Sequence, residues 1–178
     1  MLLLTFILMY VFLGLYLKRE QVENYCISIL GCIIICYTSN EILSVFNRLD
    51  RKHLIVLYAI IDIALLVLIS FKLKEKKDFI QNIKFFFCDI KNNKMGLVFA
   101  ALFGAMLVLA GKTVPYNWDS MTYHLPRIMQ WAQNKTVAHY ATYDIRQLTS
   151  PVLAEFINLQ VYILTGRGDS LFNLLQCF

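Results

Sequence analysis

Charged residues are scarce in this chain. They make up 16% of its 178 residues, and 58% of the residues are hydrophobic; a soluble domain carries about 25% charged residues. The apolar residues come in blocks, which is typical of membrane proteins. The net charge of +5 does not indicate nucleic acid, because seven lysines lie in one stretch, residues 72–94, between apolar segments. Such clustering is typical of a cytoplasmic loop, so we predict no nucleic-acid partner.

Paired cysteines and a cleavable leader are also missing. The five cysteines lack the paired spacing in a polar context that a disulfide framework or a zinc site needs. Cys32 and Cys36 are one helical turn apart in an apolar segment, where we expect plain helix packing. The N-terminus has no basic region and no small-residue cleavage site, so Met1 to Leu17 is predicted to be a retained span.

Long apolar runs predict membrane-spanning helices, each of which needs about 20 mainly apolar residues. We expect an all-α, polytopic fold with about five such helices and an incomplete sixth. The predicted spans are residues 1–17, 25–46, 54–71, 95–111 and a shorter, more polar 151–166, with the sixth beginning at residue 171. Asp62 interrupts the third span. No partner for it can be identified from the sequence, so we interpret it as structural.

The positions of lysine and arginine predict the orientation of these spans. Residues 72–94 hold seven lysines and are placed in the cytoplasm, so residues 112–150 fall on the external side. We therefore expect a multi-pass protein of the cell membrane in contact with membrane lipid. Its parts are an N-terminal anchor over residues 1–94 and a second membrane domain that starts at residue 95.

The stretch from Pro115 to Pro151 holds all three prolines and both tryptophans. We predict an amphipathic surface helix over Ser120 to Gln133, with a break near Leu125 because a proline at 126 removes a helical hydrogen bond. The spacing of apolar residues indicates one face, and the polar residues are placed on the other. The apolar face comprises Met121, Leu125, Ile128 and Ala132, and the opposite face Tyr123, Arg127 and Gln130.

Residues 134–150 are predicted to be a loop, and Ser150 is expected to cap the next helix, with Pro151 at its first position. On that helix Glu155, Asn158 and Tyr162 share one face. Polar residues at membrane depth are expected to face a bundle interior or a wet cavity.

Four motifs of this region are W-D-S-M-T-Y-H-L-P-R at 118–127, H-Y at 139–140, D-x-R-Q at 144–147 and S-P-x-x-A-E-F at 150–156. Taken together they resemble bacterial membrane glycosyltransferases of the GT-C class, in particular the protein O-mannosyltransferase-like (family 39) and aminoarabinose-transferase-like groups. The resemblance covers residues 95–178. It implies a sugar donor on a polyprenyl-phosphate carrier and a glycan, lipid or protein acceptor. Since these enzymes have more spans, we expect the chain to be the N-terminal part of a longer one.

In that family the first external loop carries an essential acid, and Asp119 is the matching residue. The resemblance implies that it acts as a general base on the acceptor hydroxyl; the alternative is that it caps the helix that follows. Arg146 and Arg127 are the local candidates for gripping the phosphate. The further candidates for substrate contact are His124, Tyr123, Asp144, Gln147 and Glu155.

Two other functions stay open at this stage. An accessory protein or inactive remnant would present an exposed aromatic face and no cavity. A transporter fragment would use Asp62 and Glu155 as an ion path. No metal is assigned, because no spacing among Asp119, His124, His139 and Asp144 demands a divalent ion.

Overall fold

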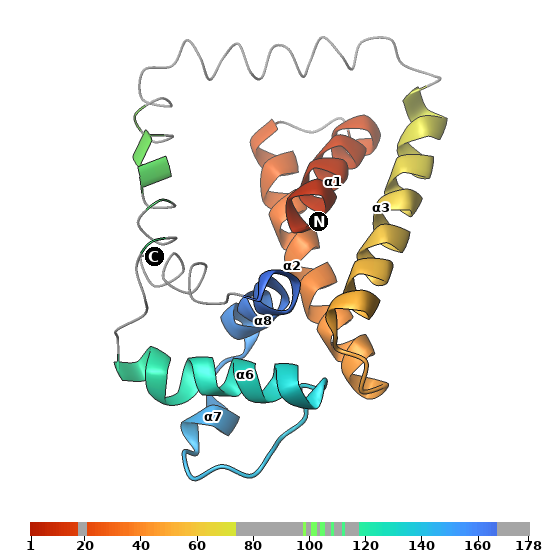
Figure 1. Ribbon diagram of the computed structural model, residues 1–178. Coiled ribbons are helices and arrows are strands. Elements are labelled where there is room, and N and C mark those ends of the chain that lie inside the picture. The colour runs from red at the N-terminus through yellow and green to blue at the C-terminus, as the bar shows by residue number, and fades with distance from the viewer. Residues whose placement is uncertain are drawn as a thin grey trace. The chain divides into compact units, whose positions relative to one another are not determined.

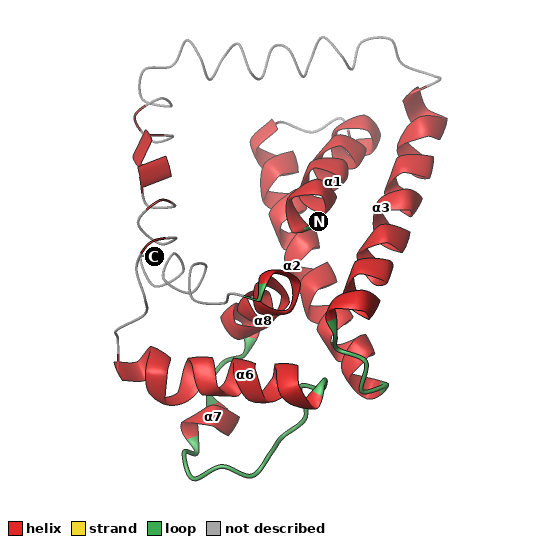
Figure 2. Ribbon diagram, in the orientation of Figure 1, coloured by secondary structure: helices red, strands yellow, loops and turns green. Residues whose placement is uncertain are grey.

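The computed structural model describes residues 1–17, 21–73 and 118–166, together with the isolated positions 98, 101, 102, 104, 105, 108 and 112. Every regular element in these ranges is a helix, and they contain no strand, which confirms the all-α prediction (Figures 1 and 2). The predicted span 95–111 and the basic stretch 72–94 lie largely outside the described residues, and the predicted sixth span lies wholly outside them.

The first three helices follow the apolar runs closely. They are α1 (Leu2–Leu17), α2 (Gln21–Val45) and α3 (Arg51–Leu73). Within the described ranges two segments are long and apolar enough to cross a membrane, Glu23–Val45 and Arg51–Phe71. The apolar helices Leu2–Tyr16 and Leu153–Thr165 are shorter. That these helices cross a membrane, and that the fold is polytopic, stays a prediction.

The chain forms two compact units, and α2 and α3 each contribute to both. The first unit contains α1, the first part of α2 and the second part of α3. Its apolar core is Leu8, Leu15, Leu65 and Ile69. Asp62, only 6% exposed, accepts a hydrogen bond of 2.7 Å from the hydroxyl of Thr5 on α1. The buried acid therefore has the partner that the sequence alone did not reveal, which agrees with a structural role.

The second unit joins the end of α2 and the start of α3 to the helices that follow residue 118. These are η1 (Ser120–His124), α6 (Leu125–Asn134), α7 (Arg146–Thr149) and α8 (Leu153–Thr165). Buried Gln160 of α8 donates from Nε2 to the hydroxyl of Ser39 at 2.7 Å and accepts at Oε1 from the hydroxyl of Tyr58 at 2.6 Å. One buried amide thus links α8 to both α2 and α3.

The expected break at Leu125 takes the form of a change of helix type. η1 is a π-helical turn, closed by the Leu125 N–H donating to the carbonyl of Ser120, and α6 begins at Leu125 with a proline in its first turn. A proline there costs no hydrogen bond, because the first N–H groups of a helix have no partner inside it. The helix ends at Asn134 and is capped by Lys135, which has the left-handed backbone conformation (φ 55°).

The predicted apolar face of this helix is wrong in part. Arg127, Ile128 and Trp131 are buried, whereas Met121 is 60% exposed. The face is rotated because Arg127 finds a buried carboxylate, so a residue assigned to the polar side lies in the interior.

The predicted cap at Ser150 is also wrong. Ser150 ends α7 in an extended conformation (ψ 147°), and α8 starts at Leu153 with Val152 at its N-cap. The residue before a proline avoids helical backbone angles, which separates α7 from α8 at this point.

Candidate functional site

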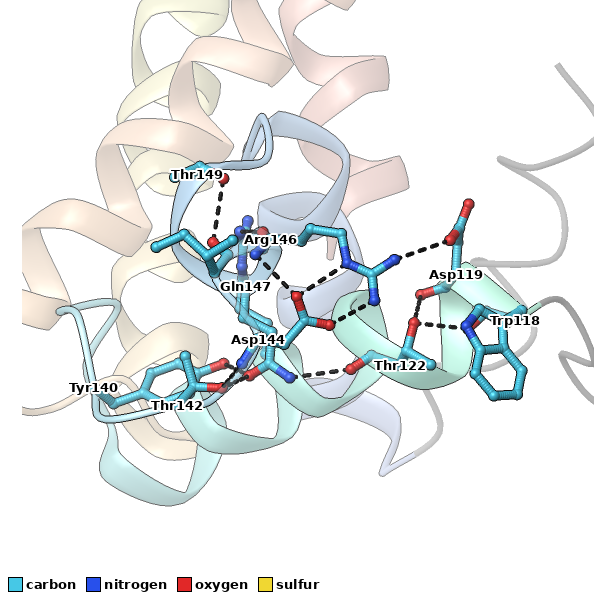
Figure 3. Close-up of polar contacts among 11 residues, drawn as sticks. Trp118, Asp119, Thr122, Tyr140, Thr142, Asp144, Arg146, Gln147 and Thr149 are labelled. Atoms are coloured by element: carbon cyan, nitrogen blue, oxygen red, sulfur yellow. Dashed lines mark hydrogen bonds and ion pairs between the residues drawn. The ribbon is translucent and has the colours of Figure 1, made fainter.

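An ion-pair cluster joins Asp119, just before η1, to the loop and short helix around residues 144–147 (Figure 3). The guanidinium of Arg146 holds Asp144 with two hydrogen bonds, Nε to Oδ1 at 2.9 Å and Nη2 to Oδ2 at 2.7 Å. Its Nη1 lies 3.6 Å from Oδ1 of Asp119. The predicted base and the predicted phosphate-gripping arginine therefore lie side by side.

Asp119 does not act as the helix cap that was its alternative assignment. Its backbone is helical (φ −61°, ψ −41°), and its side chain makes no capping hydrogen bond to η1. A capping residue normally has an extended backbone and accepts from the first turn. The carboxylate is instead 53% exposed and directed at Arg146.

Tyr123 and Gln147 hold this cluster together. The guanidinium of Arg146 lies over the ring of Tyr123, 4.8 Å from its centroid, a favourable cation–π contact. The amide of Gln147 donates to the carbonyl of Thr122 at 3.0 Å and accepts from the hydroxyl of Tyr140 at 2.7 Å. The α7 segment is thereby fastened to η1 by a side chain as well as by charge.

Arg127 and Glu155 form a buried ion pair behind the cluster, with side-chain exposures of 0% and 1%. The guanidinium of Arg127 also donates to two backbone carbonyls, that of Ser150 at 3.1 Å and that of Arg146 at 2.7 Å. Three of its hydrogen bonds are thus used to join α6 to α7 and α8. Arg127 is therefore placed to hold the framework, and it has no exposed surface to offer a phosphate.

His124 shares the carboxylate of Glu155. Its Nδ1 lies 2.5 Å from Oε1 of Glu155, and a quarter of its side chain is exposed. The ring of Tyr123 packs beside it, with centroids 4.0 Å apart. The structure therefore gathers the eight candidate residues into two layers. The first, the exposed layer, is built around Asp119 and Arg146, which are 53% and 46% exposed, and includes Tyr123, Asp144 and Gln147. The inner layer is built around the buried pair Arg127 and Glu155 and includes His124.

The exposed layer carries two carboxylates for one guanidinium. Hydrogen bonds from the side chain of Arg146 hold the pKa of Asp144 below its usual range, and the same contacts raise the pKa of Arg146. A phosphate that binds Arg146 must therefore compete with a bidentate carboxylate already in place. Burial raises the pKa of the Tyr140 phenol, which favours the protonated form that donates to Gln147.

The described residues contain no group of three His, Cys, Asp or Glu side chains placed to hold a metal ion. His139 lies on the loop after α6 and lines a pocket with Trp131. The roles of Thr122, Tyr140 and Gln160 were not recognised in the sequence. These side chains are uncharged and belong to no recognisable motif of their own, so nothing in the sequence distinguishes them from neighbouring residues.

No protein-family model, curated protein or solved structure matches this chain. The likeness to membrane glycosyltransferases therefore rests on the four motifs between residues 118 and 156 alone.

Proposed function

We propose that this chain acts as a membrane glycosyltransferase that moves a sugar from a polyprenyl-phosphate carrier to an acceptor hydroxyl outside the membrane. The observation that carries the proposal is the 3.6 Å approach of Asp119 and Arg146, which are 27 residues apart (146 − 119). Both are accessible, at 53% and 46% exposure, so a substrate can reach them.

The proposed chemistry assigns a role to each of these two groups. The acceptor oxygen attacks the anomeric carbon of the donor, and its proton passes to the carboxylate of Asp119. The bond from that carbon to the phosphate oxygen breaks, and the electron pair stays on the phosphate, which leaves as polyprenyl phosphate. Arg146 would stabilise the charge that develops there, after exchanging one of its carboxylate partners for the phosphate.

A membrane location is supported by the apolar side chains that α2 and α3 leave exposed. Leu30, Ile34, Val56, Ile60, Ile63 and Leu66 are each at least half exposed. Such surfaces are rare on soluble monomers and favourable against lipid. Helices of this length also match the thickness of a bilayer.

The direct test is a transfer assay with the full chain in liposomes. Polyprenyl phosphates carrying radiolabelled mannose, glucose or aminoarabinose are supplied on the outer side, together with a bacterial envelope extract as the acceptor. The proposal expects release of polyprenyl phosphate and a labelled product. Intact donor after long incubation, with protein shown to be folded by its thermal transition, would contradict it.

A second candidate function is a binding role without chemistry. Trp118 is 75% exposed, and Tyr143 and Ile145 are strongly exposed in the loop between α6 and α7. Exposed aromatic residues of this kind are typical of partner-binding surfaces. Co-purification of a partner that Tyr143→Ser abolishes, in a protein without transfer activity, would favour this alternative.

A further inference from the structure

A pocket of about 180 Å³ lies inside the second unit. The side chains that carry the argument are Glu41 of α2, Trp131 of α6, His139 and Tyr140 of the following loop, Gln147 of α7 and Phe156 of α8. At about 30 Å³ for each water in the liquid, the volume equals that of about six waters. The volume is on the scale of one small ring rather than of a polyprenyl chain.

The apolar part of the wall combines three aromatic side chains, Trp131, Tyr140 and Phe156, with the aliphatic Val137, Leu148 and Val152. Trp131 and Phe156 pack edge to face, with ring centroids 5.4 Å apart. The hydroxyl of Tyr140 is held by Gln147, so a fixed polar edge lies beside the aromatic rings. A mostly apolar wall with a few fixed polar groups is typical of small-molecule sites. A sugar ring matches this wall, because it presents C–H groups on its faces and hydroxyls around its edge.

Glu41 gives the pocket its charge. Within the described ranges its carboxylate has no hydrogen-bond or ion-pair partner, although it lies in the pocket wall. The other charged wall residue, Arg127, is offset by Glu155. Among the described residues, the pocket wall therefore holds one carboxylate without a counter-charge, beside aromatic rings. Hydroxyl and ammonium groups are favourable opposite such a carboxylate, whereas a second carboxylate is repelled.

We propose that this pocket binds a single sugar ring, neutral or amino-substituted, with Glu41 accepting hydrogen bonds from its hydroxyl or ammonium groups. The inference rests on the proposed function, because the substrate of the transferase would supply that ring. Gln147 links the pocket to the Asp119 site, since its Oε1 accepts from Tyr140 of the pocket wall while its Nε2 donates to the carbonyl of Thr122.

The fluorescence of Trp131 can report binding in the pocket, because the chain has two tryptophans and Trp131 is the one that lines the pocket. Trp118 is 75% exposed, so Trp118→Phe leaves Trp131 as the single fluorophore at little structural cost. This variant of the full chain is placed in lipid nanodiscs without glycoside detergents. It is then titrated with free glucose, glucosamine and glucuronate.

The proposal expects a saturable change in Trp131 fluorescence with glucose and glucosamine, and none with glucuronate. In the same background, Glu41→Gln should weaken the binding about tenfold or more, because a charged hydrogen-bond acceptor is lost. The matched control Glu23→Gln, on the same helix but in the other unit, should leave it unchanged. Should Glu41→Gln fail to fold, Glu41→Asp, which keeps the charge and shortens the side chain, replaces it and should also weaken binding.

The outcomes separate this inference from the proposed function. A chain that transfers sugar while Trp131 responds to no sugar overturns the pocket assignment and leaves the transferase standing. If Trp131 responds to sugars as expected but the chain transfers no sugar, the sugar-binding pocket is supported and the transferase function is contradicted. Glucuronate binding as tightly as glucose, or equal losses in the Glu41 and Glu23 variants, also overturns the assignment.

Discussion

Arg127 donates a hydrogen bond from Nη2 to the backbone carbonyl of Arg146 at 2.7 Å. The buried guanidinium of Arg127 therefore holds the backbone of Arg146, whose own side chain is 46% exposed. Since Arg146 in turn meets Asp119, the buried arginine controls the geometry of the exposed ion pair through the main chain.

Removing one partner of the buried pair is predicted to be costly. Arg127→Leu leaves the carboxylate of Glu155 buried without its main counter-charge, which costs about 3–5 kcal/mol. The thermal transition should fall, and trypsin should cut faster after Arg146, because its carbonyl is no longer held. The double variant Arg127→Leu/Glu155→Leu should recover most of the thermal loss. A double variant no more stable than the single one would contradict this account.

The hydrogen bond between Thr5 and Asp62 is predicted to stabilise the first unit. Thr5→Val keeps the shape of the side chain but leaves a buried carboxylate oxygen without its donor, at a cost of about 1–3 kcal/mol. Thr5→Ser, which keeps the hydroxyl, is the matched control. Thermal unfolding in a mild detergent measures the difference. Equal transition temperatures for the valine and serine variants would show that the bond contributes nothing.

The sequence predicted the helices better than the contacts between them. Apolar runs gave α1, α2 and α3 within a few residues, and Pro126 marked the change at Leu125. Periodicity describes one helix at a time, so it could not reveal Glu155, 28 residues after Arg127, as the reason that an arginine turns inward.

For the candidate site too, the sequence predicted the residues better than the contacts between them. The motifs brought attention to Asp119 and Arg146, which do lie together. They did not indicate that Gln147 would bridge Tyr140 and η1. Such hydrogen bonds depend on how a loop folds back, and no local pattern of residues determines that.

The pH dependence of the exposed cluster follows from Asp144. Hydrogen bonds from Arg146 lower the pKa of this carboxyl in the folded protein. Its ion pair therefore stabilises the fold fully above the unfolded pKa of about 3.9, and the contribution is lost as the pH falls through the folded pKa. Carboxyl ¹³C chemical shifts, assigned with Asp144→Asn, measure the titration. In Arg146→Gln the pKa should return toward its ordinary value, and no difference between the two proteins would contradict this.

The most direct test of the central claim compares the rate of sugar transfer by two carboxylate-to-amide variants in the liposome assay. Asp119→Asn keeps the size of the side chain but removes the proposed base, so the rate should fall about 10²–10⁴-fold. The control is Asp50→Asn, because Asp50 pairs with His53 away from the cluster. This change should leave the transfer rate within a few-fold of the original. A similar small effect of both changes would contradict the assignment of Asp119 as the base.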